Sequence, residues 1–133
     1  MTADLTTQDE TAIRTAAYGT VSLLSAAGIA GSAHKIGTDA SLALVAATGT
    51  VGHVVANAKG VKLKGKSTAE LADQVFPAIT ESVRVLEAHD PAEAENFRST
   101  IRVVIEAAER AHKGEPSPVM AEMIRKINAA LNA

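Results

Sequence analysis

The sequence predicts an all-α fold, a compact bundle of four to six helices in a single domain. Four patterns typical of helix starts occur along the chain, and apolar residues follow each of them at intervals of three or four positions. The 133 residues include one tyrosine, two phenylalanines and no tryptophan, so the core must be built from Ala, Val, Ile and Leu. Because small side chains bury little apolar area, such a core favours further burial through self-association.

The first predicted helix runs from about Gln8 to Ala27. Thr7 and Glu10 have the spacing of a capping box. The apolar positions expected to face inward are Ile13, Ala16, Ala17, Val21, Leu24 and Ala27.

A second long helix is predicted over Ala40–Ala58. Gly28 weakens the end of the first helix, and Gly37-Thr38-Asp39 offers a stop followed by a new cap. Gly49 and Gly52 are the two places where this second helix could break. The two segments form an Ala/Gly-rich N-terminal helical pair.

A short basic linker, residues 59–66, divides the chain. It separates the Ala/Gly-rich half, residues 7–58, from a charged helical half, residues 67–133. The linker contains four lysines, whereas the residues after it are net acidic. The sequence therefore predicts one positive spot on a negative body.

The charged half should contain three helices. The first begins at a capping box formed by Ser67 and Glu70 and runs to about Glu87, with a kink at Pro77. Its expected inward residues are Leu71, Val75, Ala78, Ile79, Val83 and Leu86.

The last two helices each begin at a proline. One starts at Asp90-Pro91 and ends at Gly114, and the other starts at Ser117-Pro118. The expected inward residues are Phe97, Ile101, Val104, Ile105 and Ala108 in the former, and Val119, Met123, Ile124, Ile127 and Leu131 in the latter.

The segment Gly60 to Ser67 fits the phosphate-binding loop pattern G-x-x-x-x-G-K-[ST] at every position. In such a loop, backbone N–H groups at a helix start point at an anion, and a lysine neutralises it. The candidate anion-binding residues are therefore Lys64, Lys66 and Ser67, and a nucleotide- or phosphate-binding protein is one alternative function. The other interpretation is a solvated linker whose Ser67 only caps the next helix.

Nucleotide hydrolysis requires a buried strand before the loop and a second acidic segment that holds magnesium. Thr50–Ala56 could form the strand, but Arg102–Glu106, the nearest match to the acidic segment, lies inside a predicted helix. We therefore expect no hydrolysis, no catalytic residue and no cofactor.

A membrane-associated helical hairpin is the second alternative. The segments Thr15–Ala33 and Ala40–Ala58 are uncharged and long enough to cross a bilayer. The second segment is only weakly apolar, and the chain lacks the aromatic residues that border membrane spans. We therefore expect closely packed helices without membrane contact.

Two histidine positions are candidates for a metal ligand or a base. Glu109 and His112 have the Glu-x-x-His spacing of di-iron bundles, but the pair occurs once and lies near a helix end, so we expect no metal. His53 interrupts an apolar segment and is interpreted as a hydrogen-bonded core or interface histidine.

The charge and the N-terminus limit the partners and the compartment. The net charge of −2 argues against general nucleic-acid binding, which needs a basic surface. The N-terminal residues are acidic where an export signal would be basic, so the cytoplasm is the expected compartment.

These features predict a small binding or interaction protein and not an enzyme. We expect a homodimer whose contact includes Val21 to Val55, because small residues spaced four apart, such as Ala43 and Ala47, let helices approach closely. A bulky residue in place of Ala27 or Ala43 should then change the assembly.

Overall fold

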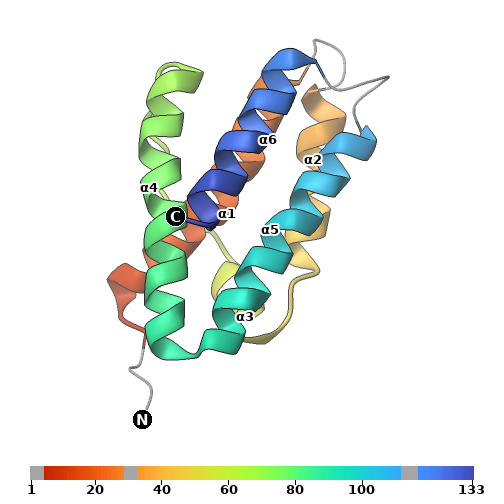
Figure 1. Ribbon diagram of the computed structural model, residues 1–133. Coiled ribbons are helices and arrows are strands. Elements are labelled where there is room, and N and C mark those ends of the chain that lie inside the picture. Colours follow the sequence, from red (N-terminus) through yellow and green to blue (C-terminus); the bar gives the residue numbers. More distant parts are fainter. Residues whose placement is uncertain (1–4, 29–32, 112–116) are drawn as a thin grey trace.

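Six helices pack together in the computed structural model, which describes residues 5–28, 33–111 and 117–133 (Figure 1). The helices are α1 (Thr7–Ala27), α2 (Ala33–Val45), α3 (Gly49–Val55), α4 (Thr68–His89), α5 (Pro91–Ala111) and α6 (Pro118–Leu131). The described ranges contain no strand. The predicted all-α class is confirmed.

The centre of the bundle is α1, which contacts all the other helices. Consecutive residues from Ile13 to Ala17 are buried, so neighbours cover every side of α1 over this stretch. Such a helix needs small or apolar residues around its whole circumference, which explains why α1 lacks a marked polar face. At Gly19 the packing against α4 is so close that an added Cβ would lie 2.4 Å from Cγ2 of Val75.

The start of α1 differs by one residue from the prediction. The N-cap is Thr6 and not Thr7: its hydroxyl accepts a hydrogen bond from the Asp9 N–H, and the Asp9 carboxylate accepts one from the Thr6 N–H, both at 3.0 Å. The pairs Thr6/Asp9 and Thr7/Glu10 have the same spacing and equivalent chemistry. The sequence pattern alone could not choose between them.

The predicted helix Ala40–Ala58 is wrong in its bounds. The residues Gly37-Thr38-Asp39 lie inside α2 and do not stop it, and the helical segment breaks before Gly49, whose φ is +72°. Gly37 serves a close approach between helices, since a Cβ there would lie 2.5 Å from the Ser25 Oγ of α1. Of the two predicted break points, Gly49 is used and Gly52 lies within α3.

The helix starts of the charged half agree with the sequence. The hydroxyls of Ser67 and Ser117 accept hydrogen bonds from the N–H groups of Glu70 and Met120, each at 3.2 Å. The helix α4 is continuous through Pro77. The predicted end of α5 at residue 114 lies outside the described residues.

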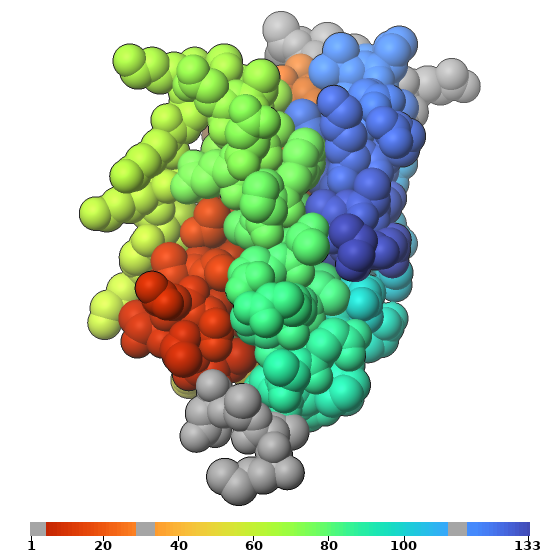
Figure 2. Space-filling view, turned by 60° about the vertical axis from the view of Figure 1, so that its left-hand side comes forward, coloured from red at the N-terminus to blue at the C-terminus, as the bar shows by residue number. Residues whose placement is uncertain are grey.

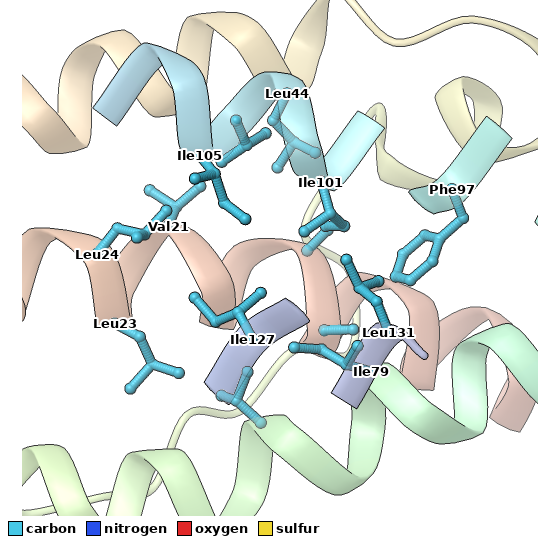
Figure 3. Close-up of a cluster of buried hydrophobic side chains, with 14 of the residues drawn as sticks. Val21, Leu23, Leu24, Leu44, Ile79, Phe97, Ile101, Ile105, Ile127 and Leu131 are labelled. Carbon is cyan, nitrogen blue, oxygen red and sulfur yellow. The ribbon is translucent and has the colours of Figure 1, made fainter. Parts of the chain in front are cut away.

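Most predicted inward residues of α4, α5 and α6 are buried, and Val119 is the clear exception. It is 62 % exposed, whereas Met120 beside it is fully buried. The buried stripe of α6 is therefore Met120, Met123, Ile127 and Leu131. Figure 3 shows the core from within, where side chains of α1, α2, α4, α5 and α6 converge. No helix in the described ranges is both long and apolar enough to cross a membrane.

Candidate functional sites

The Gly60–Ser67 loop leads into the N-terminus of α4 and is held there by side chains of that helix. The Lys64 N–H donates to the Gln74 side-chain oxygen at 3.0 Å, and the Lys66 N–H donates to the Glu70 carboxylate at 2.7 Å. The Gln74 amide nitrogen donates to the Lys62 carbonyl oxygen at 2.6 Å. Two backbone amides that could have faced an anion are thus already hydrogen bonded, one of them to a carboxylate.

The lysine side chains of this loop remain exposed. Lys62, Lys64 and Lys66 make no ion pair with any described residue, and the first two line a cavity of about 590 Å³ together with Glu70 and Asp73. The loop therefore presents ammonium groups next to carboxylates. An anion here would be attracted by lysine side chains and not by a nest of free amides.

The segments expected to support phosphate transfer have other structures. The residues that could have formed the preceding strand lie in α3, which ends at Val55, and Arg102–Glu106 lies in the middle of α5. The described residues around the loop thus lack both the strand and the acidic strand end that a nucleotide-hydrolysing site uses.

A short helix is clamped at both ends by side chains from its neighbours. At its C-terminus, Arg14 Nε donates to the Val54 carbonyl at 2.8 Å, and the Tyr18 hydroxyl donates to the Val55 carbonyl at 2.7 Å. At its N-terminus, the Glu93 carboxylate accepts a hydrogen bond of 3.2 Å from the Val51 N–H. The positive Arg14 lies at the negative end of the helix dipole, and the negative Glu93 lies at its positive end. Both charges therefore stabilise α3.

The described part of the chain contains no group of three or more His, Asp or Glu side chains that could hold a metal ion. His53 lies in the last turn of α3 and is exposed, so its interpretation as a core histidine is wrong. The register of α3 explains this: its buried residues are Val51, Val54 and Val55, which places residue 53 outward. Glu109 is exposed on α5, and His112 lies outside the described residues.

A groove of about 830 Å³ runs between α1 and α2. Its lining combines small and aliphatic residues with hydroxyl groups and one histidine: Val21, Ser22, Ser25, Ala26, His34, Gly37, Thr38, Ser41, Leu42 and Val45. Leu42 and Val45 are each 62 % exposed. In contrast, Ala27 is 4 % exposed and packs inside the chain's own core, so a bulky residue there would disturb folding and is no clean test of assembly.

A second groove, of about 880 Å³, lies between α4 and α6. Its floor contains Phe76 and several alanines, and its walls carry charged residues. Neither groove could be predicted from the sequence, because neither follows from the pattern of a single helix.

The described residues form an all-α fold with an α1–α2 groove, an α4–α6 groove and an exposed basic loop. Comparison with protein-family models, with curated protein sequences and with solved structures finds no match to this chain.

Proposed function

We propose that the chain is a small helical interaction protein that pairs with a second copy of itself through the α1–α2 face. The observation that supports this most is the composition of the groove between these helices. Of the 13 Lys and Arg and 15 Asp and Glu residues of the chain, none is among the described residues that line this groove, although His34 is. Depletion of charge at the centre is what distinguishes the core of a protein interface from ordinary surface.

The aliphatic residues of the face are arranged for pairing. Leu42 and Val45 lie three positions apart on α2, so their side chains project from one side of the helix. In a two-fold contact each residue is used twice, so four large side chains would be covered. Full burial of each such side chain contributes roughly 1.5–3 kcal/mol, and part of this remains available at 62 % exposure.

That gain must exceed the cost of association, which is about 4 kcal/mol or more. The four side chains alone would only offset this cost, so the small residues of the groove must also be covered. Ala26 and Ser41 leave room for the side chains of a second copy to approach closely.

Because the chain has no cysteine, cross-linking through single introduced cysteines tests this pairing. Leu42→Cys and Val45→Cys place a thiol on the proposed contact, and Val119→Cys is the matched control because residue 119 is also 62 % exposed. A disulfide forms only when the two Cα atoms are within about 7 Å. We expect rapid disulfide-linked dimers from at least one of the α2 variants at micromolar concentration, and little from the control. Equal yields from all three variants would mean random collision and would overturn the proposal.

Weak anion binding by Lys64, Lys66 and Ser67 is a second proposal. It is supported by the exposed ammonium groups of the loop, which no described carboxylate pairs. It ranks second because the neighbouring amides of Lys64 and Lys66 are already hydrogen bonded.

A further inference from the structure

The groove between α4 and α6 has a largely apolar floor, in which Ala72 and Phe76 pack against the core and Ala130 belongs to it. The α4 residues on this face are Ala69, Ala72, Asp73, Phe76, Pro77, Thr80 and Glu81. They recur at helical spacing over three turns, roughly 16 Å along the axis. The stripe is separate from the buried one, which contains Val75, Ile79, Val83 and Leu86. In Figure 2 this face is turned forward, with α4 in green and α6 in blue.

Alanines lie on both walls of the groove, and the Thr80 hydroxyl on α4 donates a hydrogen bond of 2.9 Å to the Ala130 carbonyl on α6. Ala69 and Ala72 on α4 face Ala129 and Ala130 on α6, and Phe76 lies in the middle of the α4 stripe. Small residues on both walls allow a third helix axis to come close, and a partly buried aromatic ring provides an anchor for its apolar side chains.

Two hydrogen-bond acceptors on the α4 wall of the groove lack a donor among the described residues. Pro77 has no N–H, so the carbonyl of Asp73, four positions earlier, lacks its normal helical donor. The Asp73 carboxylate makes no hydrogen bond or ion pair with any described residue, and both residues line the groove. This wall therefore presents a carbonyl and a carboxylate that together favour a cationic donor.

The other charges of the groove are mostly compensated. The hydrogen bond from Arg84 lowers the pKa of Glu81, and that from Arg125 lowers the pKa of Glu122, so both carboxylates stay ionised and paired. Lys126 on α6 makes no ion pair with a described residue. The charged groups of the groove without an ion pair to a described residue are thus Asp73 on the α4 wall and Lys126 on the α6 wall, although Lys126 also attracts Glu122 on its own helix and helps to lower the pKa of that carboxyl.

We propose that this groove binds an amphipathic helix of a different protein, with an arginine on the edge that faces α4 and a carboxylate on the edge that faces α6. An apolar stripe at every third or fourth position fits a straight groove between two helices. A guanidinium has five N–H donors, so it can bond the Asp73 carboxylate and the Asp73 carbonyl together.

A second copy of this chain does not match the groove. Among the described residues, the large exposed apolar side chains are Leu42, Val45, Val103 and Val119. Only the first two share a helix, and α2 contains no arginine. The complementary helix therefore belongs to another protein, and this proposal is independent of pairing through the α1–α2 face.

The test uses a fluorescein-labelled synthetic helix of about five turns with a leucine stripe, arginines on one edge and glutamates on the other. The control peptide has glutamates on both edges. Fluorescence anisotropy against the full chain should give saturable binding of the first peptide and at least about fivefold weaker binding of the second. No saturable binding of the first peptide up to about 500 µM, or equal binding of both, would overturn the proposal.

Three variants locate the site. Asp73→Asn should weaken peptide binding at least about fivefold, whereas Glu106→Gln, which removes an exposed carboxylate from α5, should leave it unchanged. Pro77→Ala supplies the missing N–H to the Asp73 carbonyl, so it should weaken binding while raising the thermal unfolding midpoint. Weaker binding in a more stable protein cannot come from damage to the fold. Unchanged binding in both groove variants would overturn the proposal.

One more variant distinguishes peptide binding in this groove from self-association of the chain. Leu42→Asp should disrupt pairing and still bind the peptide with unchanged affinity. If the peptide instead dissociated a dimer of the unmodified chain, or if Asp73→Asn abolished that dimer, the groove would be occupied by a second copy, and the assignment to a different partner would be wrong.

Discussion

Arg14 and Val54 are 40 positions apart in the sequence, and Arg14 Nε donates a hydrogen bond of 2.8 Å to the Val54 carbonyl oxygen. The same guanidinium donates to the Lys59 carbonyl at 3.3 Å and lies 3.5 Å from the Glu10 carboxylate. One side chain of the central helix thus fixes the end of α3 and the beginning of the basic linker. A helix of seven residues is not stable alone, so its position depends on such contacts.

Replacing this arginine should loosen α3 selectively. Arg14→Met keeps most of the apolar stem but leaves the Val54 carbonyl without its donor. We expect a loss of about 2–4 kcal/mol in the free energy of unfolding, measured by urea denaturation. Amide hydrogen exchange should rise first in residues 49–59. Arg14→Lys should retain only part of the stability, because an ammonium cannot span both carbonyls. A change below about 0.5 kcal/mol for Arg14→Met would show that the clamp is dispensable.

Gly19 should be intolerant of even one added methyl group. Although alanine has the higher helix propensity, its Cβ would lie 2.4 Å from Cγ2 of Val75. We expect Gly19→Ala to destabilise the fold by about 1–3 kcal/mol. In the background of Val75→Ala the same substitution should cost much less, and a double-mutant cycle measures that coupling. Strict additivity of the two changes would contradict the close packing of α1 on α4.

The Gly60–Ser67 loop should not bind nucleotides tightly. We expect no micromolar binding of ATP or GTP with magnesium by calorimetry, since the loop follows a helix and its amides at 64 and 66 are bonded to α4. Weak phosphate binding that falls in Lys64→Ala and Lys66→Ala would fit a simple anion site. Micromolar nucleotide binding that disappears in Lys66→Ala would show that the eight-residue pattern decides the function.

The helices of the charged half were predictable because their starts depend on local chemistry. A serine hydroxyl or a first-turn proline acts within one turn, so Ser67 and Pro118 could be recognised without knowing the fold. The stripe of α5 was also predictable, because that helix has one buried face and one charged face.

The features that the sequence did not reveal depend on contacts between distant segments. Gly37 looks like a helix stop, but it lies where α2 packs against Ser25 of α1. The pair Arg14–Val54 and the two grooves likewise require the packed bundle. The interpretation of His53 as a core histidine failed for a related reason, since α3 is too short for an apolar pattern to define its buried side.

The most direct test of the proposed self-pairing is sedimentation equilibrium of the unmodified chain beside the double variant Leu42→Asp/Val45→Asp, with Val119→Asp as the control of equal exposure. We predict a dimer at micromolar concentration for the unmodified chain and for the control, and a monomer with an unchanged helical spectrum for the double variant. Sedimentation of the unmodified chain as a monomer at micromolar concentration and above, or a double variant that remains dimeric, would contradict pairing through the α1–α2 face.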